Sequence, residues 1–179
     1  MLLYTDNFFT KEKLKFYQSL FLKTPLKFVK DPTGLHYGFR SDMFELIPEY
    51  SEYIKDIKKT IFKKLKIINT YKKTGTFFHK RKPTKNGENL EDVRRIHKDY
   101  NSYWNCLIYL SGKESLGNGT SFYTLENNNY TVSSSIAFKE NRAILFRGNI
   151  WHGTTQVYDP NSTWRDSINV FFERKQNGK

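Results

Sequence analysis

The strongest constraint on the fold is the alternation of polar and apolar side chains in the second half of this 179-residue chain. A period of two is that of a β-strand with two unlike faces, and glycine and asparagine interrupt the pattern where turns are expected. The predicted strands lie at residues 93–99, 105–109, 117–123, 133–139, 143–146 and 164–172. Short strands at this spacing predict a mainly β fold, a two-sheet jelly roll or double-stranded β-helix.

The first part of the chain instead shows two helical patterns. Thr10 can cap a helix that runs to about Leu22. A second helix is expected to begin with Pro48 in its first turn, and an apolar stripe continues along one face to Leu65. We expect these N-terminal helices to flank the jelly roll and to buttress its outer face.

Length and composition are consistent with one domain that has its own hydrophobic core. A helical and extended part would span about residues 1–66 and the jelly-roll core about 67–173. Two further strands are expected at the start of that core, at 67–71 and 76–78, with a turn at 72–75 between them.

Two histidines and one aspartate are the candidate metal ligands. His97 and Asp99 are two residues apart, so on an extended strand both side chains project from one face. His152 follows a later apolar run and a turn signal, where a strand could return beside the first. Two imidazoles and one carboxylate form the facial triad of non-haem Fe(II) oxygenases. The alternatives are a zinc site, for which the single cysteine Cys106 offers little, and a surface histidine beside a solvated aspartate.

The last predicted strand carries a candidate anion site. An iron oxygenase also needs an electron-donating co-substrate, in the commonest chemistry 2-oxoglutarate, whose far carboxylate requires a cation. Arg165 and Ser167 share one face of that strand and offer a guanidinium fork and a hydroxyl for such a carboxylate. The alternative is an ordinary surface arginine.

In this order, the motifs resemble those of the Fe(II)- and 2-oxoglutarate-dependent dioxygenases, and within them the prolyl 4-hydroxylase-like branch. The segments that carry the resemblance are His97–Asp99, Leu107–Ser111, Gly117–Phe122, Arg142–Phe146 followed by His152–Gly153, and Arg165–Ser167. They cover roughly the last ninety residues, and the Asp6–Phe9 start is similar as well.

The resemblance implies a role for each matched residue. His97, Asp99 and His152 would bind Fe(II) and form the catalytic centre, and Arg165 would pair with the distal carboxylate of 2-oxoglutarate. Tyr109 occupies a position where such enzymes often place a hydroxyl against that carboxylate. Molecular oxygen would be the second co-substrate, and ascorbate could support activity. This chain departs from the family pattern in two respects. Several prolyl hydroxylases have a lysine where this chain has Arg165, and the spacing from His152 to Arg165 is longer than expected for the family.

The resemblance further implies hydroxylation of an unactivated C–H bond, and a protein or peptide side chain is the expected substrate. The residues expected to bind it are Arg95, Tyr100, Tyr103, Trp151 and Lys82. The basic segment 79–90 is either a lid over the site or a plain solvent loop.

Charge leaves the substrate class open. The chain has 30 basic and 18 acidic residues, a net charge of +12, which favours an anionic partner or substrate. A nucleic-acid or small-molecule oxygenase is therefore the alternative, and a non-catalytic jelly-roll binding module is the second alternative. A lysine-rich composition without any anionic partner would give the same charge.

The cysteine count and the first residues of the chain indicate the cellular compartment in which the protein is expected. A single cysteine cannot form an internal disulfide, and the first residues show no basic start with a long apolar run. No stretch is long enough to span a bilayer. We expect a cytoplasmic protein without a membrane partner.

Overall fold

A computed structural model of the chain describes residues 1–30, 37–67, 71–81, 96–155, 160 and 163–174. The helices are α1 (Lys11–Lys23) and α2 (Ser51–Leu65), and two short 3-10 turns, η1 (Phe44–Leu46) and η2 (Pro48–Tyr50), precede α2. The strands are β1 (Leu2–Thr5), β2 (Lys27–Lys30), β3 (Tyr37–Arg40), β4 (Tyr71–Arg81), β5 (Trp104–Ser111), β6 (Ser115–Glu126), β7 (Asn129–Phe138), β8 (Ala143–Arg147), β9 (Trp151–Thr154) and β10 (Arg165–Arg174).

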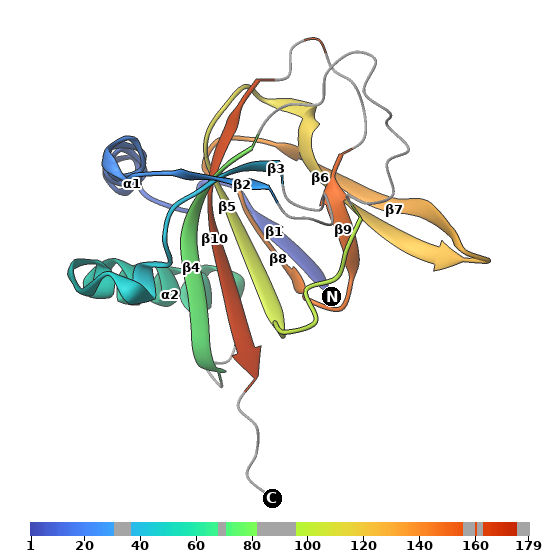
Figure 1. Cartoon of the computed structure of the whole chain (residues 1–179), viewed down its shortest axis with the longest axis horizontal. Coiled ribbons are helices and arrows are strands. Elements are labelled where there is room, and N and C mark those ends of the chain that lie inside the picture. Colours follow the sequence, from blue (N-terminus) through green and yellow to red (C-terminus); the bar gives the residue numbers. More distant parts are fainter. Residues whose placement is uncertain (31–36, 68–70, 82–95, 156–159, 161–162, 175–179) are drawn as a thin grey trace, which may run out of the picture.

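The strands form two antiparallel sheets. The larger sheet has seven strands in the order β1-β8-β5-β10-β4-β3-β2, and the smaller sheet has the order β7-β6-β9. Both helices lie on one side of the larger sheet, and the smaller sheet lies on its other side (Figure 1). This arrangement confirms the predicted mainly β jelly roll with helices against its outer face.

Apolar side chains at alternate positions join the larger sheet to the helices. On β10, Ile168, Val170 and Phe172 are at most 1% exposed and belong to the same core cluster as Ile57 and Ile61 of α2. Helix α1 begins as predicted, because the Thr10 hydroxyl accepts a hydrogen bond from the Lys13 backbone N–H at 3.3 Å. The apolar helix faces and the sheet therefore form one continuous core.

A smaller apolar cluster separates the two sheets on one side of the interior. Its buried members come from β5, β6, β7 and β8: Tyr109, Phe122, Ile136, Phe138, Ile144 and Phe146. Strands β10, β4 and β3 continue the larger sheet beyond this cluster. The space over those strands holds the cavity described below.

Two predictions about local structure were wrong. The expected turn at 72–75 is instead part of the continuous strand β4, which pairs with β10 through Gly75 and Phe171. Pairing with a long neighbouring strand supplies ladder hydrogen bonds that outweigh the turn tendency of glycine. Pro48 lies in η2, one short turn before α2 begins.

The segment around the first predicted metal ligand is also less regular than expected. Residues 93–95 lie outside the described residues, and His97 forms only an isolated antiparallel bridge with His152. Conversely, β1 was not predicted, although it pairs with β8 over four residues at the edge of the larger sheet.

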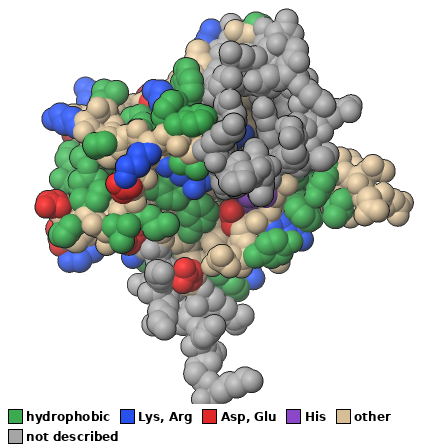
Figure 2. Space-filling model, in the orientation of Figure 1, with side chains coloured by type: hydrophobic (Ala, Val, Ile, Leu, Met, Phe, Trp, Pro, Cys, Tyr) green, Lys and Arg blue, Asp and Glu red, His purple; other side chains and the backbone are tan. Residues whose placement is uncertain are grey.

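The basic residues of the chain are dispersed on the face of the molecule that Figure 2 shows. On the visible face, outside the residues drawn in grey, lysine and arginine side chains are scattered among apolar ones (Figure 2). Within the described residues, no helix combines the length and apolar character that a membrane span requires.

Candidate active site

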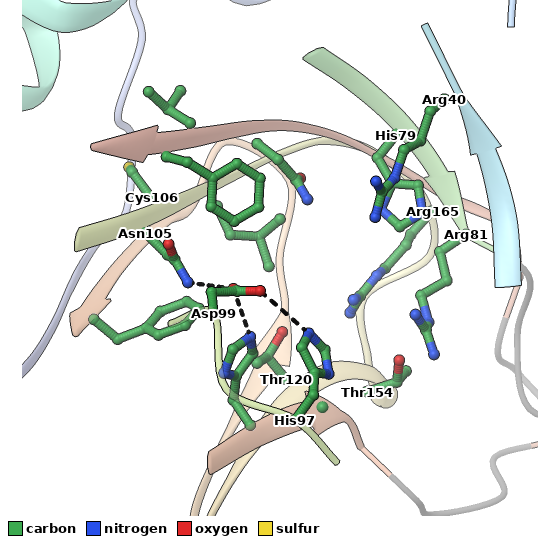
Figure 3. Close-up of a pocket in the computed structure, with 17 residues that line it drawn as sticks. Arg40, His79, Arg81, His97, Asp99, Asn105, Cys106, Thr120, Thr154 and Arg165 are labelled. Carbon is green, nitrogen blue, oxygen red and sulfur yellow. Dashed lines mark hydrogen bonds and ion pairs between the residues drawn. The ribbon is translucent and has the colours of Figure 1, made fainter. Parts of the chain in front are cut away.

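A cavity lies between the two sheets, over β3, β4, β10 and β5 and against β9. Its empty volume, including the open mouth, is about 610 Å³. The side chains at one end are two imidazoles and a carboxylate, and those at the other end are arginines (Figure 3). Apolar walls with a few convergent polar groups are typical of binding sites for small molecules and cofactors.

The backbone holds His97 and His152 side by side. Each residue donates its backbone N–H to the carbonyl of the other, both at 3.0 Å, so the two form a hydrogen-bonded antiparallel pair. Their ring centroids are 4.4 Å apart. Strand β9 therefore places the second histidine beside the first, as the sequence suggested.

The Asp99 carboxylate lies beside the two imidazoles because Gly148 allows the backbone of the Asp99 loop to approach the turn after β8 closely. The Asp99 backbone N–H donates to the Gly148 carbonyl at 2.8 Å. A Cβ at Gly148 would lie 2.2 Å from the Ser102 carbonyl oxygen and 2.6 Å from that of Asp99, so a larger residue would displace this loop. The turn after β8 thereby fixes the position of the carboxylate.

The three side chains converge on one small volume. Asp99 Oδ1 is 3.7 Å from His97 Nε2, and Asp99 Oδ2 is 3.3 Å from His152 Nε2. One potential ligand atom from each of the three residues lies within 4.8 Å of the others. This spacing suits three ligands on one face of a metal ion.

Neighbouring groups orient two of these ligands. His152 Nδ1 lies 2.9 Å from the Ile150 carbonyl, so it carries the proton and leaves the Nε2 lone pair directed toward Asp99. The Asn105 side-chain amide donates to Asp99 Oδ2, and the Ser102 hydroxyl donates to the Asn105 side-chain oxygen. Such outer contacts hold metal ligands in place.

Arg165 is a buried cation at the opposite end of the cavity. Its side chain is 6% exposed, and Nη1 donates to the backbone carbonyls of Asn118 and Gly119 on β6. Within the described residues, Nε has no hydrogen-bond partner and the guanidinium forms no ion pair. Burial lowers the pKa of Arg165, while the neighbouring Tyr109 acts in the opposite direction. A buried guanidinium in this state is set up to receive an anion.

Tyr109 and Ser167 lie near Arg165 but make protein contacts. The Tyr109 hydroxyl is 2.9 Å from the Thr120 hydroxyl, and the guanidinium carbon of Arg165 is 5.4 Å from the centre of the Tyr109 ring. The Ser167 hydroxyl is 3.0 Å from Asn169 Oδ1 and donates to the His79 carbonyl at 3.3 Å. Their predicted roles toward 2-oxoglutarate stay predictions.

Comparison with known proteins gives no sequence match. No family model matches the chain, and no curated protein matches it. Solved structures, in contrast, share its architecture over nearly its whole length.

Three of these structures illustrate the likeness. An oxidoreductase of the 2OG-Fe(II) oxygenase family from Burkholderia pseudomallei has a TM-score of 0.65 and 14% identity, covering 99% of this chain and 86% of that one. HygX from Streptomyces hygroscopicus, with nickel and 2-oxoglutarate bound, has a TM-score of 0.63 and 15% identity, with coverages of 97% and 83%. A prolyl-4-hydroxylase from Pseudomonas putida has a TM-score of 0.58 and 10% identity, with coverages of 98% and 93%.

The chain has the fold of the Fe(II)- and 2-oxoglutarate-dependent oxygenases.

In this oxygenase fold, the predicted substrate-binding residues that the structure describes, Tyr100, Tyr103 and Trp151, do not line the cavity. Lys82 and Arg95 lie outside the described residues, as does segment 82–90 of the suggested lid. Tyr100 is 75% exposed, and Tyr103 lies under the guanidinium of Arg147 at 3.5 Å. Trp151 contacts Tyr130 and the Lys98 ammonium. Substrate binding by these residues stays a prediction.

The cavity of the oxygenase fold also contains residues that the sequence did not single out. They are Arg40, His79, Arg81, Asn105, Thr120 and Thr154. His79 and Arg81 were assigned to a loop, but they end β4 and face the cavity from its wall. The two-residue spacing of His79 and Arg81 could have placed both side chains on one face of a strand. The wrongly predicted turn at 72–75 ended the expected strand at residue 78, so both residues were assigned to the loop that follows.

Proposed function

We propose that the protein is an Fe(II)- and 2-oxoglutarate-dependent dioxygenase that hydroxylates an unactivated C–H bond. The observation that carries the proposal is the convergence of two imidazoles and one carboxylate opposite a buried arginine, inside an oxygenase fold. Chance placement of a histidine beside a solvated aspartate would not explain the second histidine or the arginine.

The residues fit the two groups that this chemistry needs. His97, Asp99 and His152 would hold Fe(II), and the guanidinium of Arg165 would hold the distal carboxylate of 2-oxoglutarate. When bound, iron and 2-oxoglutarate supply with molecular oxygen the oxidant for a C–H bond, and 2-oxoglutarate becomes succinate and CO2.

Charge also supports this assignment. Two neutral imidazoles and one aspartate leave Fe(II) with one net positive charge, and the dianion 2-oxoglutarate reverses its sign. Arg165 would then balance the assembly, which removes the cost of a buried cation without a counter-ion. The protein's own task is to orient the ligands and to keep bulk water from the site.

Proposed substrates of this dioxygenase are protein or peptide side chains, in the manner of prolyl hydroxylases. Two neighbours in structure support this class, the prolyl-4-hydroxylase from Pseudomonas putida and a prolyl hydroxylase from Trichoplax adhaerens in complex with a peptide fragment, the latter at a TM-score of 0.51 and 12% identity. Exposed Tyr100 and half-buried Trp151 are aromatic surfaces beside the metal loop that could receive a prolyl ring.

A small-molecule substrate is the competing proposal, because HygX also has a structure with hygromycin B bound. Proline-containing peptides and small metabolites can be compared as stimulants of succinate formation. We expect the peptides to stimulate. Stimulation by a small metabolite but by none of the peptides would replace the peptide proposal.

The central experiment measures succinate from 2-oxoglutarate with added Fe(II) and ascorbate. We expect turnover by the wild type and none by Asp99→Ala or Arg165→Ala. Asp42→Ala and Arg147→Ala are matched controls, since neither residue lines the cavity, and both should retain turnover. Absence of 2-oxoglutarate binding by the wild type under anaerobic Fe(II) would overturn the proposal and favour the binding-module alternative.

A further inference from the structure

One buried hydroxyl in the wall of the cavity is not used by the protein itself. The Thr154 side chain is 6% exposed and lines the cavity, and its oxygen Oγ1 has no hydrogen-bond partner within the described residues. Buried hydroxyls are as a rule hydrogen-bonded, because burial without a partner costs free energy. A valine would fill the same space without that cost, so the threonine carries a polar group that the fold does not need.

The neighbouring buried hydroxyls all have partners. Thr120, which pairs with Thr154 across β6 and β9, has its hydroxyl 2.9 Å from that of Tyr109. Ser121 donates to the Thr155 hydroxyl at 3.1 Å, and neither of these two residues lines the cavity. In contrast, the Thr154 hydroxyl is directed into the cavity (Figure 3). It is therefore available to a bound molecule.

Thr154 lies between the metal-binding group and the buried arginine. It follows His152 by two residues on β9, so its side chain is on the same face about 7 Å further along the strand. Figure 3 shows it on the side of the cavity where Arg165 lies. A five-carbon diacid held by a metal at one end and by Arg165 at the other would pass this hydroxyl.

The backbone of β6 holds Thr154 and Arg165 at the same end of the cavity. Arg165 Nη1 donates to the Gly119 carbonyl at 2.5 Å, and the Thr155 backbone N–H donates to the same oxygen at 3.3 Å. Gly119 is closely packed, since a Cβ there would lie 2.3 Å from the Ile136 carbonyl oxygen. The arginine and the residue after Thr154 thus share one firmly placed acceptor.

Arg165 also has an unused donor. Its Nη1 donates to two backbone carbonyls, whereas its Nε has no hydrogen-bond partner in the part of the chain that the structure describes. A carboxylate has two oxygens with about four acceptor sites, so it can accept from a guanidinium and from a hydroxyl at once. One carboxylate at this end of the cavity would therefore satisfy both Arg165 and Thr154.

We propose that the Thr154 hydroxyl donates a hydrogen bond to the distal carboxylate of 2-oxoglutarate, beside the guanidinium of Arg165. The inference rests on the proposed function and adds to it a co-substrate-binding residue on β9. This short strand then supplies one group to the metal, His152, and one to the far end of the co-substrate. Because the hydroxyl makes no bond within the protein, it has none to break before it binds.

The test compares two ligands that differ in the distal group. They are 2-oxoglutarate and 2-oxopentanoate, which has the same five carbons but ends in a methyl group. Calorimetry with Ni(II) under anaerobic conditions measures binding without turnover. Thr154→Val removes the hydroxyl at nearly constant volume, and Thr154→Ser keeps it. Thr155→Val is the matched control, because it removes a buried hydroxyl of the next residue that bonds Ser121 outside the cavity.

We expect Thr154→Val to weaken 2-oxoglutarate binding by about 10- to 100-fold, the range for a lost hydrogen bond to a charged group. Thr154→Ser and Thr155→Val should bind 2-oxoglutarate within about threefold of wild type. For 2-oxopentanoate, Thr154→Val should also stay within about threefold of wild type, because this ligand has no carboxylate at that end.

The stability of the ligand-free protein gives a second readout with the opposite sign. Thr154→Val should leave the thermal unfolding midpoint unchanged or raise it, because it removes an unpaired buried hydroxyl. Thr155→Val should lower the midpoint, because Ser121 loses a partner. A lower midpoint for Thr154→Val together with unchanged affinity for 2-oxoglutarate would assign the hydroxyl a structural role and overturn the inference.

Two other results would overturn it while sparing the proposed function. Equal 2-oxoglutarate affinity of Thr154→Val and wild type would mean that the hydroxyl contacts only water. An equal loss for both ligands would place its effect at the metal end or in the shape of the cavity. In either case, 2-oxoglutarate binding by the wild type and its loss in Arg165→Ala would leave the proposed function standing. Absence of 2-oxoglutarate binding by the wild type would overturn both.

Discussion

The two faces of the larger sheet have opposite compositions although they belong to the same strands. Toward the helices, β4 presents Phe78 and β10 presents Ile168, which are both fully buried in apolar surroundings. Toward the cavity, the same strands present His79, Arg81 and Arg165, which are also buried but polar.

The difference separates stability from chemistry within one sheet. Apolar burial on the helix side favours folding without any ligand. On the cavity side, burial of the Arg165 guanidinium costs free energy until an anion compensates its charge. Substitutions on the two faces should therefore have opposite signatures, one in stability and the other in ligand binding.

The largest expected effect is on the cavity face. His152→Ala should abolish succinate formation, because it removes one of three metal ligands, while the free energy of unfolding stays within about 1 kcal/mol of wild type. Urea denaturation and the succinate assay check both parts. A fall of several kcal/mol in the free energy of unfolding would show that His152 contributes to stability as well as to activity, contrary to the proposed division between the two faces.

The matching change on the helix side is Phe78→Ala. Phe78 is 0% exposed, with ring centroids 5.1 Å from Phe21 and 4.8 Å from Phe44, so truncation should cost about 3 to 5 kcal/mol. Phe28→Ala, at a 50% exposed position on β2, should change stability by less than about 1 kcal/mol. The folded fraction of Phe78→Ala should bind 2-oxoglutarate with the affinity of the wild type. Weaker binding would show that packing on the helix side also affects the ligand site on the cavity side.

A smaller effect is expected at Asn105, which holds Asp99 through its side-chain amide. Asn105→Ala should weaken Ni(II) or Fe(II) binding by about 10- to 100-fold, because the carboxylate loses its orienting contact. Metal titration measures the change. Ser121→Ala, a buried hydroxyl of β6 that bonds Ser135 and Thr155, is the control and should leave metal affinity unchanged.

The smallest effect concerns the ion pair of Asp6 and Arg142, neither of which lines the cavity. The hydrogen bond from Arg142 holds the pKa of Asp6 below its usual range. A lowered carboxyl pKa stabilises the folded state above the unfolded pKa, and this contribution is lost as the pH falls through the folded value. Asp6→Asn should cost under about 1 kcal/mol at pH 7, since the carboxylate is partly exposed.

Denaturation at two pH values tests this prediction. The difference between Asp6→Asn and wild type should shrink as the pH falls below about 4. Asp42→Asn, which breaks an exposed pair with Lys27, should show little effect at either pH. A difference that stays constant with pH would mean that Asp6 acts through packing and not through its charge.

Local patterns predicted much of this molecule before any tertiary contact was known. The Thr10 cap, the apolar stripe of α2 and the alternation along β10 each depend on neighbours within a few residues. The spacing of His97 and Asp99, the later His152 and the alternation of Arg165 with apolar residues likewise identified the candidate ligands. These signals are local, so the sequence by itself determined the fold class and the candidate centre.

Tertiary structure decided what depends on distant strands. Pairing with β10 made β4 continuous through Gly75, and that strand carried His79 and Arg81 to the cavity wall. The His97 bridge with His152, and the position of Arg40 over Phe77, likewise require partners far along the chain. Hydrogen-bond ladders and burial are set by such partners, so the placement of Arg40, His79 and Arg81 on the cavity wall could not be predicted from local pattern.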